Sequence, residues 1–99
     1  MPNRFAVGHR DLNEPLITAV LSRAGIEYIL LREGDGADIL VKDNPMYFVE
    51  VKNDSQPPSK RKLTDDEIRL QAECERNGIE FYVVLTPEQM AEIVNERRR

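Results

Sequence analysis

The sequence predicts a single α/β domain in which a mixed four-stranded sheet is flanked by helices. Apolar residues between Leu16 and Ala24 recur at the three- and four-residue spacing of a helix. Short runs rich in β-branched and aromatic residues follow, and turn residues separate them. A strong helix start at Thr64 and a further apolar run after Gly78 complete the order α-β-β-β-α-β-α.

The length and composition indicate one globular domain that spans residues 1–99. This length suffices for one core, and the chain is 40% hydrophobic and 32% charged. The formal net charge of −4 argues against a cationic coat protein for nucleic acid. It does not exclude a metal-dependent nuclease, because a bound divalent metal offsets the charge of its carboxylate ligands.

The sequence carries no signal for membrane insertion or secretion. No apolar run approaches the ~20 residues of a helix that spans a bilayer. The first residues lack the apolar stretch of a signal peptide. Cys74 is the single cysteine, which excludes an internal disulfide framework and a cysteine-based zinc site. We therefore expect no membrane partner and a reducing, cytoplasmic compartment.

The first helix is predicted between a polar start and a glycine stop. Residues 1–10 carry no periodic signal and are expected to form an irregular lead-in. Asp11 or Asn13 can cap the helix, and Gly25 ends it. Glu14 falls in the first turn, at the edge of the inward face, where the helix dipole favours a carboxylate.

Three short strands are predicted after this helix, separated by turns that contain glycine, asparagine or proline. Their ranges are 26–31, 37–41 and 46–52. Turns of this length favour antiparallel hairpins. Asp38, near the start of the second strand, should then lie opposite Glu50 and Lys52 at the end of the third.

The second half of the chain predicts a crossover from strand to helix to strand. A capping box at Thr64–Glu67 starts the helix, and Gly78 supplies a left-handed stop. The strand at 79–85 is the most apolar, and we expect it to be central and parallel to the third strand. Thr86 caps a last helix that leads into a basic tail at residues 95–99.

Glu50 and Lys52 lie two residues apart in an apolar strand and therefore share one of its faces. With Asp38 opposite, Glu50 provides hard oxygen ligands of the kind that Mg²⁺ prefers, and the backbone carbonyl of Val51 could complete the set. Such a site would support metal-assisted hydrolysis of a phosphodiester. Lys52 could orient the attacking water or stabilise the phosphorane charge, and any role as a base depends on its pKa.

Each of these residues also has an ordinary structural interpretation. Glu50 and Lys52 could be an ion pair at a solvated strand end. Glu14 could be a simple first-turn helix acid. Gln71 could be a half-exposed polar residue, although its neighbours place it toward the sheet. Cys74 is expected to be a small core residue.

Four segments together resemble the PD-(D/E)XK nuclease superfamily, and within it the small phage and bacterial VRR-NUC proteins related to Holliday-junction resolvases. They are Arg10-Asp11-x-Asn13-Glu14, Gly36-Ala37-Asp38-Ile39-Leu40, Glu50-Val51-Lys52 and Pro58-Ser59-x-Arg61-Lys62-Leu63-Thr64. Each motif is short, and the specific feature is their order and spacing. The resemblance covers the chain from Arg10 to Thr86. Ala37 stands where the superfamily name has Pro, which is a variable position.

The resemblance implies a restriction-endonuclease-like core with Mg²⁺ or Mn²⁺ at Asp38 and Glu50. It implies Lys52 as the catalytic lysine and Glu14 as a further acidic member that is a possible metal ligand. Gln71 matches a polar helix residue that supports such sites.

We therefore expect a Mg²⁺- or Mn²⁺-dependent endodeoxyribonuclease that acts on structured or branched DNA in phage or bacterial replication and repair. The candidates for contact with the DNA backbone are Arg10, Lys60, Arg61 and Lys62. So small a domain offers little surface, and we expect a homodimer. The alternatives are a binding module of the same fold that does not cut, and a small interaction protein whose carboxylates are ordinary surface.

Overall fold

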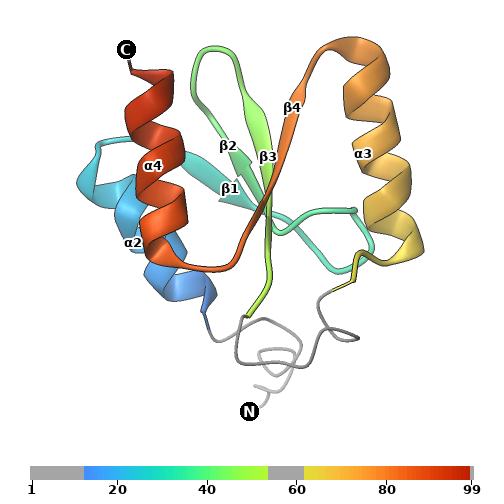
Figure 1. Cartoon of the computed structure of the whole chain (residues 1–99), viewed down its shortest axis with the longest axis horizontal. Coiled ribbons are helices and arrows are strands. Elements are labelled where there is room, and N and C mark those ends of the chain that lie inside the picture. Colours follow the sequence, from blue (N-terminus) through green and yellow to red (C-terminus); the bar gives the residue numbers. More distant parts are fainter. Residues whose placement is uncertain (1–12, 54–61, 99) are drawn as a thin grey trace.

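A computed structural model describes residues 13–53 and 62–98 of the chain (Figure 1). The order of elements is the predicted α-β-β-β-α-β-α. The elements are α2 (Glu14–Arg23), β1 (Tyr28–Leu30), β2 (Ile39–Val41), β3 (Tyr47–Val51), α3 (Asp65–Asn77), β4 (Glu80–Val84) and α4 (Pro87–Arg97). The predicted lead-in at 1–10, with Arg10, and the basic residues Lys60 and Arg61 lie outside the described residues.

The four strands form one mixed sheet in the order β1-β2-β3-β4. The pairs β1·β2 and β2·β3 are antiparallel, whereas β3 and β4 are parallel. The two predicted hairpins and the predicted crossover through α3 are therefore confirmed. The turns are short enough for hairpins, and the helix-containing connection is long enough to return the chain in the same direction.

The expected central position of β4 is wrong, because β4 is the last strand at one edge of the sheet. Its apolar sequence has another cause. The strand runs between α3 on one face of the sheet and α4 on the other, so both of its faces carry side chains that pack against helices (Figure 1). A strand that helices cover on both faces has a nearly continuous apolar sequence, even when it pairs with a neighbouring strand along only one edge.

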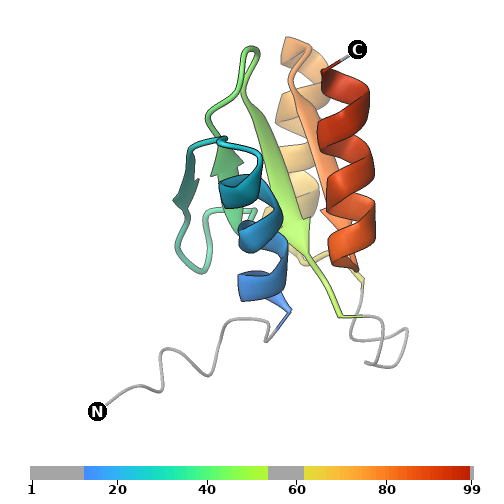
Figure 2. The same ribbon diagram turned by 90° about the vertical axis from the view of Figure 1, so that its left-hand side faces the viewer.

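Helices α2 and α4 cover one face of the sheet and α3 covers the other (Figures 1 and 2). Alternate residues of β3 point to these two layers. Tyr47 and Val49 are fully buried and Val51 is nearly so, and all three belong to the core that α2 and α4 complete. The other members of this core are Ile17, Leu21, Ile26, Ile39, Val41, Val84, Met90 and Val94.

The start of α2 is attached to the sheet by Asn13. Asn13 occupies the N-cap position, but its side chain makes no capping hydrogen bond, which corrects the expected capping role. Its Nδ2 donates instead to the backbone carbonyls of Lys52, at 3.3 Å, and Leu85, at 2.5 Å. These carbonyls lie at the C-terminal ends of β3 and β4. Asn13 therefore fixes the first turn of α2, with Glu14, beside that end of the sheet.

Helix α3 begins and ends as its sequence predicts. The Thr64 hydroxyl accepts from the Glu67 backbone, and the Glu67 carboxylate accepts from the Thr64 backbone, so the capping box is complete. Gly78 has φ +69°, in the left-handed region. Cys74 is 2% exposed and confirms its predicted place in the interior, where burial raises the pKa of its thiol.

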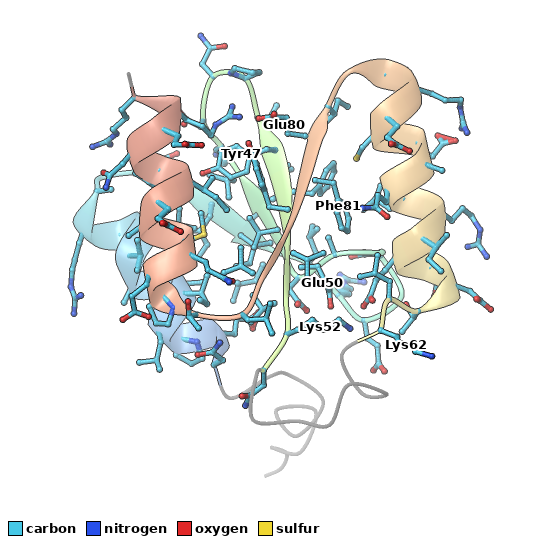
Figure 3. All side chains as sticks on the ribbon, viewed as in Figure 1. Tyr47, Glu50, Lys52, Lys62, Glu80 and Phe81 are labelled. Atoms are coloured by element: carbon cyan, nitrogen blue, oxygen red, sulfur yellow. The ribbon has the colours of Figure 1, made fainter. Side chains whose placement is uncertain are left out.

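The basic tail expected at 95–99 is helical through Arg97, because α4 continues to that residue. The Arg97 guanidinium lies 4.1 Å from the centre of the Tyr47 ring. It donates to the Pro45 carbonyl at 2.5 Å and also to the Glu80 carboxylate. Arg97 thus binds the last turn of α4 to the N-terminal ends of β3 and β4. This attachment lies opposite the Glu50–Lys52 end of the sheet (Figure 3).

The loop before β2 approaches α3 so closely that it requires glycine. Gly36 has φ +96°, and a Cβ there would lie 2.7 Å from the Leu70 Cβ and 2.9 Å from the Asp66 carbonyl oxygen. Gly34 in the same loop has φ +93° but meets nothing within 4 Å. Two residues after Gly36 comes Asp38. The contact therefore sets the distance between α3 and the start of β2.

We predict that Gly36→Ala destabilises the fold more than Gly34→Ala does. Both substitutions introduce left-handed strain of about 1–2 kcal/mol. Only Gly36→Ala also overpacks the contact with Leu70 and Asp66, which typically costs a further ~1–3 kcal/mol. Urea unfolding of the two variants measures the difference. Equal free energies of unfolding would show that the loop does not pack against α3 in this way.

Candidate functional site

Asp38 lies at the C-terminal end of β3, as the hairpin predicts. The β2·β3 register pairs Ile39 with Val49, so Asp38 is opposite Glu50. The Asp38 backbone N–H donates to the Val49 carbonyl at 3.1 Å. Its carboxylate Oδ2 accepts from the backbone N–H of Val51 at 2.7 Å. The side chain is thus held against β3 by a hydrogen bond to a charged acceptor, which is the stronger kind.

Glu50 and Lys52 project from the β3 face that α3 covers (Figure 3). Their residues are 4% and 9% exposed, and the Lys52 Nζ lies 3.3 Å from Glu50 Oε2. A solvated ion pair at the strand end is therefore ruled out as an interpretation of these two residues. Burial of two ionisable groups requires compensation, because each loses its hydration shell.

Glu67 of α3 supplies part of that compensation. Its Oε1 lies 3.1 Å from the Lys52 Nζ, and the same oxygen accepts the capping hydrogen bond from the Thr64 backbone at 2.8 Å. The sequence pattern predicts only the capping-box role of Glu67. Its second role has a signal in the sequence, since Glu67 lies four residues before Gln71 and helical residues at that spacing share a face.

The carboxyl groups of the site differ in their tendency to hold a proton. Burial raises the pKa of Glu50 to about 9, and the hydrogen bond to Glu67 and the negative charges of Asp38 and Glu67 act in the same direction. Burial also acts to raise the pKa of Glu67, but its hydrogen bonds with Glu50, Thr64 and Lys52 outweigh this, so the pKa is lowered. The negative charge of the pair therefore resides on Glu67, and Glu50 holds a proton at neutral pH.

Lys52 keeps its charge in this environment. Burial acts to lower its pKa, but the hydrogen bond to Glu67 and the charge of Glu50 outweigh burial and raise it. The ammonium is therefore protonated at neutral pH. The sequence leaves several roles open for Lys52. Stabilisation of negative charge requires the protonated ammonium, which is the state found here, whereas a general base would have to be deprotonated.

The remaining predicted site residues are placed as follows. Glu14 is 4% exposed in the first turn of α2, next to Asn13. Gln71 is half-buried on α3, one turn after Glu67, and it is Glu67 that contacts Lys52. Lys62 is exposed just before α3. The contribution of Glu14 and Gln71 to catalysis stays a prediction.

The donor set fits one divalent cation. Asp38 and Glu50 lie close enough for the charge of one to raise the pKa of the other. A cation between them would offset the repulsion that now favours a proton on Glu50. The Val51 N–H faces Asp38, and the N–H and C=O of one strand residue face the same neighbour, so its carbonyl is also directed there. Mg²⁺ is commonly held by one or two carboxylates, with water and phosphate in its other positions.

A third acidic ligand is not arranged for such an ion in the part of the chain that the structure describes. Within residues 13–53 and 62–98, no group of three or more His, Cys, Asp or Glu side chains could hold a metal ion together. Of the ligands that the sequence predicts, Asp38, Glu50 and the Val51 carbonyl are the ones that could hold such an ion.

Comparisons with known proteins assign no family to this chain. Neither the scan against protein-family models nor the searches of curated proteins and solved structures gave a significant match. Within the described residues, none of the helices has the length and apolar character needed to cross a bilayer.

We predict that the stability of the metal-free protein falls as pH rises from 5 to 9. Glu50 binds its proton more tightly in the folded chain, where its pKa is about 9, than in the unfolded chain, at about 4.5. A raised pKa stabilises the fold fully below the unfolded pKa, and this stability is lost as pH rises through the folded pKa. The slope can reach at most about 1.4 kcal/mol per pH unit. Denaturant titrations in a chelator across this range measure it.

Glu50→Gln should flatten that dependence, because the amide does not titrate. Glu92→Gln, at an exposed position of α4, is the matched control and should retain the wild-type slope. Parallel curves for wild type and Glu50→Gln would contradict the protonated state of Glu50.

Proposed function

We propose that this protein is a nuclease that depends on a divalent metal and hydrolyses phosphodiester bonds of DNA. The observation that carries the proposal is the convergence of Asp38, Glu50 and Lys52 at one end of the sheet. An antiparallel register brings the first two together, and the strand period places Lys52 beside Glu50. The proposal includes a restriction-endonuclease-like core, which the mixed sheet and its helices are consistent with.

Asp38 and Glu50, with the Val51 carbonyl, would hold Mg²⁺ or Mn²⁺. When bound, the ion supplies a Lewis acid for a phosphate oxygen. Glu50 must release its proton to become a ligand, so occupancy of the site should rise with pH. Asp38 already accepts the Val51 N–H at 2.7 Å, and this hydrogen bond orients its carboxylate.

Lys52 would stabilise the negative charge that develops on the phosphate. Its Nζ carries the proton that such a role needs and is held by Glu50 and Glu67 from two elements. A fixed cation in a site of low water content acts more strongly than one in bulk solvent. Glu67 would act as a positioning residue through Lys52.

DNA would approach the end of the sheet where β3 finishes and α3 begins. Lys62 is exposed there and could contact a backbone phosphate. Structured or branched DNA as the substrate and a homodimer as the active form remain part of the proposal. The resemblance to Holliday-junction resolvases supports the substrate, and the small size of the domain supports the dimer.

A binding module that does not cut is the second candidate. The observation that favours it is the enclosure of Lys52, which is 9% exposed and contacts the carboxyl groups of both Glu50 and Glu67. A lysine so enclosed would need a change in these contacts to reach a phosphate.

We predict that the protein cuts DNA in Mn²⁺ and that Lys52→Ala lowers the rate about 100-fold or more, because a charge-stabilising donor is lost. The assay presents nicked, flapped, four-way and plain duplex substrates. Lys42→Ala is the matched control, since Lys42 is an exposed lysine that forms an ion pair with Glu27. It should cut like wild type.

Unchanged cutting by Lys52→Ala would overturn the assigned role. A wild type that cuts none of the four substrates but retains branched DNA in a gel shift would contradict the nuclease proposal and favour the binding module.

A further inference from the structure

Lys52 is the first residue after β3, and its backbone is held on both sides. Its N–H donates to the Val84 carbonyl at 2.9 Å, where β4 ends. Its C=O accepts from the Asn13 side chain, whose Nδ2 lies 3.3 Å away. Among residues 13–53 and 62–98, no backbone N–H donates to this carbonyl. Asn13 therefore provides a donor that the sheet itself does not provide.

The Asn13 side chain joins three elements of the fold. Its Nδ2 also donates to the carbonyl of Leu85, which directly follows β4, at 2.5 Å. One amide group thus links the ends of two neighbouring parallel strands. The Asn13 backbone carbonyl accepts from the N–H groups of Leu16 and Ile17, at 3.1 and 3.2 Å. The residue that binds the two strand ends is therefore itself anchored in the first turn of α2.

We infer that Asn13 is a positioning residue for Lys52, which holds the lysine backbone so that the Nζ stays between Glu50 and Glu67. This inference rests on the proposed nuclease function. Lysine carries its charge on a flexible four-carbon stem, so the Nζ is placed accurately only when the backbone is fixed as well. The contacts of the Nζ, at 3.3 and 3.1 Å, hold the far end of the same side chain.

The proposed metal ligands do not depend on this contact. Asp38 is held by the pairing of β2 with β3 and by the Val51 N–H at 2.7 Å. Glu50 lies inside the part of β3 that pairs with β4. Loss of the Asn13 amide should therefore disturb Lys52 and leave the metal ligands in place.

The attachment of α2 to the core does not depend on the Asn13 side chain alone. Ile17 and Leu21 of this helix are fully buried in the core. The Asn13 side chain makes no capping hydrogen bond within α2. A substitution of Asn13 should therefore act on the strand ends that it contacts, with α2 still packed on the sheet.

Asn13→Asp separates the role of donor from the role of helix cap. Aspartate is as good an N-cap as asparagine, and its negative charge is favourable at a helix N-terminus. A carboxylate cannot donate, however, and it would face the two carbonyl oxygens that now accept from the amide. A residue that served α2 alone would tolerate this substitution, whereas the contact with Lys52 would be lost.

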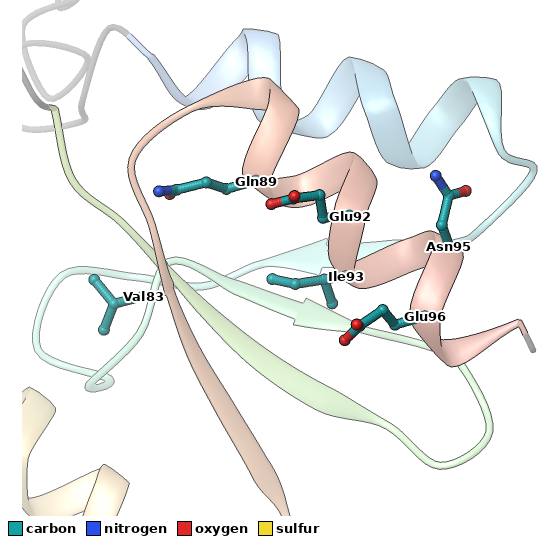
Figure 4. A pocket seen from close by; sticks show the side chains of 6 residues that line it. All are labelled: Val83, Gln89, Glu92, Ile93, Asn95 and Glu96. Carbon is teal, nitrogen blue, oxygen red and sulfur yellow. The ribbon is translucent and has the colours of Figure 1, made fainter.

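Hydrogen exchange of backbone amides tests the contact without an assay of catalysis. We expect the Lys52 amide to exchange about fivefold faster in Asn13→Asp, because a hydrogen bond that holds this residue is lost. The Val51 amide, which donates to Asp38, should keep its wild-type rate. Asn95→Asp makes the same chemical change at an exposed position of α4 and should match wild type at both amides (Figure 4). Equal exchange of Lys52 in all three proteins would overturn the inference.

The kinetics of DNA cleavage in Mn²⁺ test the consequence for catalysis. Asn13→Asp should lower kcat about 10- to 100-fold, because a small displacement of a catalytic group is costly, with KM and Mn²⁺ affinity unchanged. Asn13→Ala removes the donor without adding a charge and should lower kcat by less. In a Lys52→Ala background, Asn13→Asp should cause no further loss, because the side chain that it positions is gone.

A further loss of rate in the Lys52→Ala background would overturn the inference, because Asn13 would then act independently of Lys52. Loss of Mn²⁺ binding together with kcat would also overturn it, since that result indicates a general structural role. A wild type that cuts no substrate would contradict the nuclease proposal instead. The exchange rate of the Lys52 amide would then decide by itself whether Asn13 holds this residue.

Discussion

The burial of the Lys52 ammonium between the carboxyl groups of Glu50 on β3 and Glu67 on α3 is the interaction on which the candidate site depends. Its Nζ lies 3.3 Å from Glu50 and 3.1 Å from Glu67. Removing one partner of a buried ion pair typically costs about 3–5 kcal/mol, because the other charge is left without compensation. The contact therefore couples the packing of α3 to the chemistry of β3. The Gly36 loop also approaches the same helix closely, at Leu70 and Asp66.

The sheet separates a structural end from the candidate site. At one end of β3, Tyr47 packs against the Arg97 guanidinium and fixes the last turn of α4. At the other end, Asn13 fixes the first turn of α2 to the carbonyls of Lys52 and Leu85. Each helix of the α2–α4 layer is thus attached at a different end. The ionisable residues beside Lys52 interact mainly with one another. A divalent cation could offset the negative charge of such a cluster.

Much of this arrangement follows from short-range rules that a sequence displays. The strand period put Glu50 and Lys52 on one face, and hairpin geometry put Asp38 opposite Glu50. Contacts between segments that are distant in the sequence could not be predicted in this way. Asn13 is a residue type that commonly caps helices. Only the tertiary structure shows that its side chain donates instead to the carbonyls of Lys52 and Leu85, at the ends of β3 and β4. Glu67 fulfils the local capping pattern, which gives no sign that its carboxylate also contacts Lys52. The edge position of β4 depends on the order of the strands in the sheet, which the apolar sequence of one strand does not determine.

Binding of Mn²⁺ by the purified protein tests the central claim most directly, because it needs neither a substrate nor turnover. Electron paramagnetic resonance measures free Mn²⁺ as protein is added at pH 8. The account predicts binding by wild type and by Asp35→Asn, an exposed loop aspartate, and loss of binding in Asp38→Asn. Absence of binding in wild type, or equal binding in Asp38→Asn, would contradict a metal site at Asp38 and Glu50.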